Sequence, residues 1–291
     1  MACYDILNGL NMQKVFIHTN NKQKLGAILA KYAIERNLPA NSDTKIEILN
    51  VDNISAFREF AGKAYLRAGR LVKYNPNDLQ SFTLSRFMPP ELTNYSGRSV
   101  VIDPDIFATQ DVSPIFDIDL KGNSVAVCRK KDAWDTSVML MDCAKLQDWN
   151  IKNLLGKLER KELDYSDLMS LRNRNDVLEI PRVWNSLDTL TPETKMLHTT
   201  NRLTQPWRTG LPIDFTINPL PKLLGIIPRE PIHKLLGKYP THYQPHPDKK
   251  IEQFFFNLVK GALQSDELSR DFIRAEINRG DVRGDLLEKV A

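Results

Sequence analysis

The chain has 291 residues, of which 42% are hydrophobic and 26% are charged, so it can bury the core of one large domain, or of one domain with an appendage. Its net charge of +4 comes without a long Lys/Arg block, and we therefore expect no nucleic-acid partner. A mildly basic chain does suit an anionic ligand such as a phosphate.

The first elements predict a strand, a helix and a second strand. Residues 14–19 and 45–51 have the pattern of short strands that end in polar residues, and residues 22–36 between them show a helical stripe of apolar positions. Asn20 or Asn21 would cap that helix. The stripe consists of Leu25, Ile28, Leu29, Tyr32 and Ala33. This order indicates an α/β fold that begins with a βαβ unit.

A second helix is predicted over residues 75–87. Asn75 would be its N-cap, Pro76 lies in the first turn, and Asp78 lies near the positive end of the helix dipole. Arg86 falls on or beside the apolar face of this helix. A charge in that position needs either an internal ion-pair partner or a ligand, and the sequence leaves both explanations open.

Three apolar runs rich in β-branched residues predict further strands, at 99–102, 123–129 and 137–142. The pattern then turns helical over residues 143–173. Short extended pieces and a polar, proline-containing loop follow. Together these elements predict an α/β body with a mixed sheet.

Beyond this body the composition becomes dense in proline. Residues 219–238 are apolar and basic, which indicates a packed extension, with docking on an anionic membrane as the alternative. Helices predicted at 249–263 and 266–279 could form a homodimer interface. We therefore divide the chain into a body of residues 1–212 and a proline-rich, helical C-terminal extension of residues 213–291.

Three features predict a cytoplasmic location. No apolar run reaches the roughly 18–20 residues of a membrane-spanning helix, and the first residues lack the pattern of a signal peptide. The cysteines, Cys3, Cys128 and Cys143, are odd in number and widely spaced, which is not typical of a disulfide framework or a zinc site. Peripheral membrane contact through the extension would be compatible with this location.

Two aspartates directly follow the strand predicted at 99–102. Asp103 and Asp105, separated only by Pro104, would lie at the carboxyl end of a sheet strand, where open α/β folds bind ligands. Carboxylates this close repel each other unless a cation lies between them, and hard oxygen ligands suit Mg²⁺ or Mn²⁺. The alternative is an ordinary turn in which Asp103 caps and Asp105 is solvated.

A strand followed by D-x-D is also the first motif of haloacid-dehalogenase phosphatases. That motif prefers Thr or Val two positions after the second Asp, where this chain has Phe107. It also normally opens the fold, whereas here it lies well inside the chain. A phosphatase or a nucleotidyltransferase is therefore the less favoured alternative.

Several ordered motifs together resemble the retaining glycosyltransferases of family 8. Residues 79–120 are similar to the family's central segment: a helix with an arginine, a proline-containing loop, a strand, D-x-D, and then D-[IV]-x-x-[LI]-[FW]. Residues 136–149 resemble its [AS]-G-V-M-L-[IM]-N-x-x-x-W segment, and residues 196–207 its late H-x-x-x-x-x-K-P-W motif. The start, residues 15–30, lies where such enzymes have their nucleotide-binding first strand. The resemblance covers roughly residues 14–210.

This resemblance implies a GT-A-type α/β fold, with a Rossmann-like mixed central sheet flanked by helices and a C-terminal helical extension. It implies a metal-dependent glycosyltransferase that moves a sugar from a nucleotide-diphosphate sugar, with UDP favoured, to an acceptor and retains the anomeric configuration. The acceptor would be a carbohydrate or a lipid-linked molecule whose identity the sequence does not give.

The resemblance also implies site residues. Mn²⁺, or Mg²⁺, would be bound by Asp103, Asp105 and His198, with Asp105 as the stronger ligand. The residues in contact with the donor would be Thr19, Asn20, Arg86, Asp103, Gln205 and Trp207. Catalysis would depend on Asp103, Asp105 and Asp167.

Three departures from the family pattern concern the donor sugar. The family's D-Q-D-x-L-N segment falls on residues where Tyr165 and Ser166 replace the Asp–Gln pair and only Asp167 is kept. Gln205 replaces the lysine of the late motif, and Ser137 replaces the glycine of the V-M-L segment. These departures motivate a second hypothesis, a nucleotide-sugar-binding protein that has lost the transfer reaction.

Overall fold

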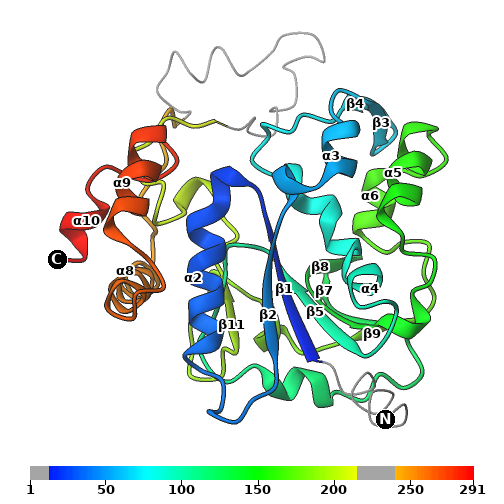
Figure 1. The fold of residues 1–291 in the computed structure, drawn as a ribbon, viewed down its shortest axis with the longest axis horizontal. Coiled ribbons are helices and arrows are strands. Elements are labelled where there is room, and N and C mark those ends of the chain that lie inside the picture. Colours follow the sequence, from blue (N-terminus) through cyan, green and yellow to red (C-terminus); the bar gives the residue numbers. More distant parts are fainter. Residues whose placement is uncertain (1–12, 215–239) are drawn as a thin grey trace, which may run out of the picture. The chain divides into compact units, whose positions relative to one another are not determined.

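The computed structural model describes residues 13–214 and 240–291 (Figure 1). The chain forms two compact units, Met1–His198 and Thr199–Ala291. The division after residue 212 that composition suggests stays a prediction. The apolar, basic segment 219–238, for which the sequence offers membrane docking as an alternative, lies outside the described residues.

A six-stranded mixed sheet is the centre of the first unit, with the strand order β2-β1-β5-β8-β7-β9. Strand β1 runs parallel to both β2 and β5, and β7 runs parallel to β9, whereas β8 is antiparallel to β5 and β7. The strands are β1 (Gln13–Thr19), β2 (Lys45–Asn50), β5 (Arg98–Ile102), β7 (Val125–Lys130), β8 (Ala133–Asp142) and β9 (Val177–Glu179). The predicted α/β fold, a Rossmann-like mixed sheet flanked by helices, is confirmed.

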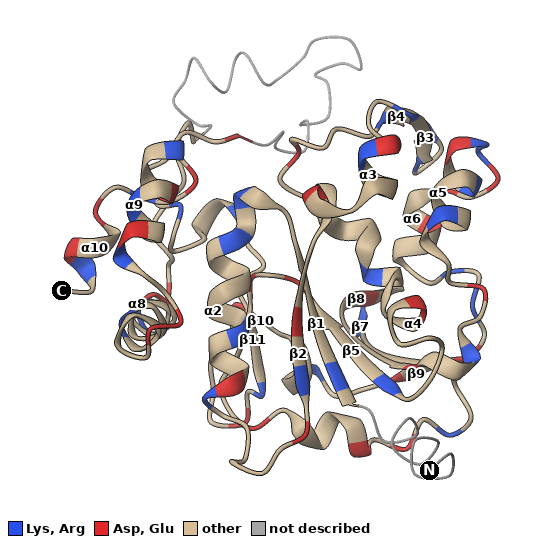
Figure 2. Cartoon of the chain, in the orientation of Figure 1, with Lys and Arg blue, Asp and Glu red and all other residues tan. Residues whose placement is uncertain are grey.

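The central strands β1, β5, β7 and β8 are buried on both faces over most of their length, as their near-continuous apolar runs predict. Helix α2 (Lys24–Glu35) packs against β1, β2 and β6. A hydrophobic cluster that includes Phe16, Val101 and Leu158 joins the strands to α5 (Ile151–Glu159). Lys, Arg, Asp and Glu residues of both signs are interspersed over the helices and loops (Figure 2).

The smaller elements of the first unit complete this arrangement. A second, three-stranded sheet has the order β10-β11-β6, and β3 and β4 form a hairpin. These strands are β3 (Ala64–Arg67), β4 (Arg70–Lys73), β6 (Ile106–Ala108), β10 (Ser186–Leu187) and β11 (Met196–His198). The short helices are α3 (Ser55–Glu59), α4 (Pro89–Leu92) and α6 (Tyr165–Met169).

The helix predicted over residues 75–87 is wrong in its first half. The structure has turns up to residue 80 and then a 3₁₀ helix, η3 (Ser81–Phe87). The side chain of Asn75 accepts a hydrogen bond from the N–H of residue 77 at 3.0 Å, and Asp78 accepts one from the N–H of residue 80 at 2.7 Å. Such side-chain bonds to the backbone two residues on compete with helix formation.

The described part of the second unit contains the two predicted C-terminal helices. They are α8 (Lys249–Gln264) and α9 (Arg270–Arg279), followed by the short α10 (Leu286–Lys289). The side chain of Ser269 caps α9, so this helix begins later than the sequence pattern suggests. Among the residues described, no helix combines the length and the apolar character needed to cross a membrane.

Candidate metal and donor site

Strands β1 and β5 end side by side at one edge of the sheet. Ile17 pairs with Ile102 in the parallel register, so the next residues, His18 and Asp103, become neighbours. Nε2 of His18 lies 2.6 Å from Oδ1 of Asp103. The carboxyl edge of an open α/β sheet is the usual place for a ligand, and the aspartate is therefore where the sequence predicted it.

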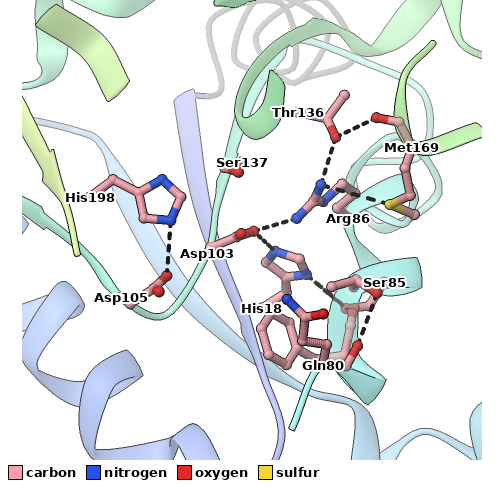
Figure 3. A network of polar contacts seen from close by, with 12 residues as sticks. His18, Gln80, Ser85, Arg86, Asp103, Asp105, Thr136, Ser137, Met169 and His198 are labelled. Carbon is pink, nitrogen blue, oxygen red and sulfur yellow. Dashed lines mark hydrogen bonds and ion pairs between the residues drawn. The ribbon is translucent and has the colours of Figure 1, made fainter. Parts of the chain in front are cut away.

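The small sheet brings His198 to the same place. Strand β6 begins at Ile106, directly after Asp105, and β11 pairs antiparallel with it so that His198 lies opposite Ile106. Nε2 of His198 is 3.4 Å from Oδ1 of Asp105, and the two side chains point toward one another in Figure 3. Backbone pairing thus joins two residues that are far apart in the sequence.

Asp103, Asp105 and His198 form one cluster, which we call the Asp–Asp–His cluster. Each contributes one potential ligand atom, and these atoms all lie within 4.8 Å of one another. Asp105 is 9% exposed and His198 5% exposed. Two carboxylates and an imidazole are a donor set that fits Mn²⁺, whereas Mg²⁺ prefers oxygen ligands alone. The structure therefore brings the three predicted ligands together, and their role in metal binding is a proposal.

Arg86 lies beside this cluster and is 6% exposed. Its Nη2 is 2.5 Å from Oδ1 of Asp103, and its Nη1 donates a hydrogen bond to Oγ1 of Thr136 at 2.6 Å (Figure 3). The ion pair with Asp103 thus explains why a charged side chain lies on the apolar face of this segment. Its Nε is buried without a hydrogen-bond partner among the described residues, and this remaining donor could serve an anionic ligand.

Oδ1 of Asp103 makes both side-chain contacts of this residue, those with His18 and with Arg86. Burial opposes ionisation of this carboxyl group, but the Arg86 guanidinium and the His18 imidazole outweigh burial and hold the pKa of Asp103 well below its usual value. Burial lowers the pKa of His18, whose Nε2 lies 2.6 Å from this carboxylate and whose Nδ1 lies 3.2 Å from the carbonyl oxygen of Phe82. Oδ2 of Asp103 has no hydrogen-bond partner in the described part of the chain and can bind a cation.

The pKa of His198 shifts in the opposite direction. Burial alone would lower it, but the carboxylates of Asp105, Asp103 and Asp135 outweigh burial and raise it above its usual value. The negative charge of these carboxylates therefore acts on this imidazole. A divalent cation would neutralise that charge.

Gly26 of helix α2 lies in close contact with the turn that contains Asp103 and Asp105. A Cβ atom added to Gly26 would lie 2.5 Å from the carbonyl oxygen of Pro104, the residue between the two aspartates. The helix backbone and the turn can approach this closely only because glycine has no side chain. Gly26 thus helps to set the position of both carboxylates.

We expect Gly26→Ala to displace the acidic turn and to weaken Mn²⁺ binding. The matched control is Gly156→Ala in α5, where an added Cβ would meet only the end of the flexible Arg160 side chain, at 3.1 Å. This control should retain binding and gain up to about 1 kcal/mol of helix stability. Mn²⁺ affinity, measured by electron paramagnetic resonance, and thermal unfolding would check both variants. Wild-type affinity in Gly26→Ala would contradict this role.

Thr19 and Asn20, predicted to contact the nucleotide, follow His18 at the end of β1. Asn20 is 2% exposed; its Oδ1 accepts from the N–H of Gln23 at 3.1 Å, and its Nδ2 donates to Oγ of Ser81 at 2.9 Å. Asn20 thus caps the 3₁₀ turn η1 (Asn21–Gln23) that leads into α2, whereas Gln23, the N-cap of α2 itself, makes no side-chain cap bond. The proposed contact of Thr19 and Asn20 with the donor stays a prediction.

Asp167, predicted to be catalytic, is not part of the Asp–Asp–His cluster. It lies in the first turn of α6 and pairs with Nη1 of Arg172 at 2.9 Å. It also lines a separate cavity of about 640 Å³, together with Trp149 and Arg174. Its catalytic role stays a prediction.

Gln205 and Trp207, predicted to contact the donor, belong to the second unit. Each is 1% exposed. The Trp207 ring stacks on Phe255 of α8 at a centroid distance of 5.4 Å, and its carbonyl oxygen accepts from the N–H of Arg283 at 2.8 Å. Trp207 is thus part of the core of this unit, and donor contacts of both residues remain proposals.

Sequence reasoning missed two residues that hold the cluster. His18 was visible as a polar residue after an apolar strand, and it contacts Asp103. Asn185 is fully buried, and its Oδ1 lies 2.8 Å from Nδ1 of His198. No local pattern marks Asn185, because only the strand register brings it to His198.

Residues 11–204 match the model of glycosyl transferase family 8. The chain belongs to this family. Membership confirms the resemblance that the motifs indicated, agrees with the predicted GT-A-type fold, and places the chain among the glycosyltransferases. It also removes the dehalogenase-type phosphatase from consideration.

Individual relatives in the family are distant. Over 84 residues the chain is 32% identical to glycosyltransferase GlyF of Streptococcus pneumoniae serotype 4 (strain ATCC BAA-334 / TIGR4), a match that covers 26% of this chain and 21% of GlyF. Galactosyltransferase LgtC, solved with donor and acceptor sugar analogues, is 16% identical over 67% of this chain and 89% of LgtC, with a TM-score of 0.46. Glycosyltransferase GlyE of S. pneumoniae TIGR4 is 18% identical over 79% of this chain and 65% of GlyE, with a TM-score of 0.48.

Proposed function

We propose that this protein transfers a sugar from a nucleotide-diphosphate sugar, with UDP as the favoured nucleotide, to a carbohydrate or lipid-linked acceptor. The observation that carries the proposal is the Asp–Asp–His cluster at the carboxyl edge of the sheet, in a chain of family 8. Retention of configuration is proposed from the family resemblance. A cytoplasmic location, peripheral membrane contact and a homodimer stay predictions.

The charges of the cluster support binding of a divalent cation. The two carboxylates, whose ligand atoms lie within 4.8 Å of each other and of the imidazole, repel each other unless a cation compensates their charge. The imidazole favours Mn²⁺ over Mg²⁺. Held by Asp103, Asp105 and His198, such an ion would stabilise the negative charge that develops on the diphosphate leaving group.

The residues of the chain then have separable tasks. Asp105, His198 and Oδ2 of Asp103 would hold the cation. Arg86, which already pairs with Asp103 at 2.5 Å, would direct its buried Nε toward the phosphates or the sugar. His18 would keep Asp103 oriented through its bond to Oδ1. The sugar would pass through an oxocarbenium-like state, for which orientation of the donor matters most.

A second candidate is a protein that binds a nucleotide sugar without transferring it. The observation in its favour is Tyr165, which stands where the family has an acidic residue. Its hydroxyl lies 2.9 Å from Oγ1 of Thr83, and the Arg67 guanidinium lies 4.8 Å from its ring. The Tyr165 side chain thus packs against Thr83 and Arg67, and the Asp167 carboxylate pairs with Arg172. Neither residue is a member of the Asp–Asp–His cluster.

Calorimetric titrations of UDP, GDP and UDP-sugars, with Mn²⁺ and with EDTA, would test the proposal. We expect UDP and at least one UDP-sugar to bind only with Mn²⁺, and the donor to be hydrolysed slowly in the absence of an acceptor. Metal-independent binding, or no binding, would refute the proposed metal-dependent function. Metal-dependent binding without hydrolysis, and without transfer to a broad panel of acceptors, would instead favour the second candidate.

A further inference from the structure

Asn185 contacts the nitrogen of His198 that faces away from the carboxylates. Its Oδ1 lies 2.8 Å from Nδ1, whereas Nε2 on the other side of the ring lies 3.4 Å from Oδ1 of Asp105. Asn185 is 0% exposed and His198 5% exposed, so water does not readily replace this contact. The imidazole is therefore held between an amide oxygen and a carboxylate.

The backbone fixes this contact from both sides. Asn185 ends the 3₁₀ helix η6 (Arg182–Asn185), and β10 begins at the next residue. Strand β10 runs parallel to β11, with Leu187 opposite His198. The N–H of Lys195, just before β11, also donates to the carbonyl oxygen of residue 183 at 2.9 Å. The position of Asn185 is thus set by two strands and a helix end rather than by a flexible loop.

The chemistry of the contact determines where the imidazole proton lies. In the structure the amide oxygen of Asn185, and not its Nδ2, faces Nδ1 of His198. An amide oxygen can only accept a hydrogen bond, so this orientation of the amide requires a proton on Nδ1. A neutral ring then has its lone pair on Nε2, which faces Asp105. The opposite tautomer would direct an N–H toward the carboxylates and could not bind a cation. Residues that fix the tautomer of a metal-binding histidine in this way typically change metal affinity by roughly 10–100-fold.

We propose that Asn185 is a positioning residue that fixes the Nδ1–H tautomer of His198 and so presents Nε2 to a divalent cation. The step from tautomer to cation binding rests on the proposed function, but the assignment of the tautomer does not. The proposal can therefore be tested in the metal-free protein and, separately, by metal binding.

The first test is the ¹⁵N NMR spectrum of the imidazole nitrogens in the metal-free protein, at a pH at which the ring is neutral. We expect wild-type His198 to show a protonated Nδ1 and an unprotonated Nε2. Asn185→Leu, which removes the acceptor, should populate the Nε2–H tautomer, and Asn185→Asp, which keeps an oxygen acceptor, should retain the wild-type pattern. An Nε2–H tautomer in the wild type would overturn the proposal even if Asn185→Leu does not fold.

The second test is the Mn²⁺ affinity of the same proteins, measured by the electron paramagnetic resonance signal of free Mn²⁺. Asn185→Leu should bind roughly 10–100-fold more weakly, and Asn185→Asp should bind within a few-fold of wild type. The control is Asn123→Leu, which removes an amide whose Nδ2 donates to the carbonyl oxygen of Leu120 at 2.8 Å, and it should leave the affinity unchanged. Unchanged affinity in a folded Asn185→Leu overturns the proposal, whereas an absence of Mn²⁺ binding in wild type refutes the proposed function and leaves the tautomer result standing.

Discussion

Replacement of Asp105 by alanine is expected to abolish Mn²⁺-dependent binding of UDP while the fold stays intact. Asp105 follows β5 and precedes β6, and its carboxylate faces Nε2 of His198 at 3.4 Å. Its removal leaves one carboxylate and one imidazole for the cation. The loss of affinity should therefore exceed the roughly 10–100-fold that is typical when only a partner of a metal ligand is removed.

Calorimetric titration of UDP at several Mn²⁺ concentrations would measure this loss, and circular dichroism would verify the fold. The matched control is Asp117→Ala, because Asp117 is an exposed carboxylate outside the Asp–Asp–His cluster. This control should bind UDP as the wild type does. If Asp105→Ala retained the Mn²⁺ dependence of UDP binding, the cluster could not be the metal site.

The sheet and the acidic turn were predictable because their signals are local. Apolar strands such as 99–102 are continuous runs, and a strand buried on both faces requires such a run. The helix at 22–36 has a clear period, and Asn20 is a typical cap for it. Asp103 could be placed because it follows a buried strand directly, where a charge requires an explanation.

The parts that sequence reasoning missed depend on strand register. Strands β10 and β11 have only two and three residues, which is too short to show any period. Nevertheless, their pairing brings Asn185 to His198, and the pairing of β1 with β5 brings His18 to Asp103. The late histidine was assigned only through the family resemblance, since no local pattern relates it to the acidic turn.

The misplaced helix start at residue 75 has a different cause. The segment has a cap, a proline and an apolar stripe, and all three favour a helix. In the structure, the side chains of Asn75 and Asp78 bond to backbone N–H groups two residues on, which stabilises turns instead. These turns delay the helical segment until Ser81, and Arg86 still reaches the cluster because η3 continues to Phe87.

Arg86→Leu is expected to reduce both stability and donor binding. The variant leaves the buried Asp103 carboxylate with His18 as its remaining partner, and breaking a buried ion pair in this way typically costs about 3–5 kcal/mol. The control Arg174→Leu also breaks ion pairs, with Asp148 and Asp176. It should lower stability without changing Mn²⁺-dependent UDP binding.

The pH dependence of unfolding separates the ion pair of Arg86 from other effects of its replacement. Because the folded-state pKa of Asp103 lies below its ordinary value of 3.8, the stability it contributes is present above that value and is lost as the pH falls toward the folded pKa. In Arg86→Leu the pKa of Asp103 moves back up, so the difference in unfolding free energy from wild type should be largest near pH 7 and should narrow below pH 3.8. Urea denaturation at pH 7 and pH 3 would measure it, and an equal difference at both values would show that the ion pair is not its source. If Arg86→Leu lowers stability at pH 7 but leaves the UDP-sugar affinity unchanged, Arg86 acts only through its ion pair with Asp103. If Arg86→Leu also lowers the affinity and Arg174→Leu does not, Arg86 contacts the donor as well.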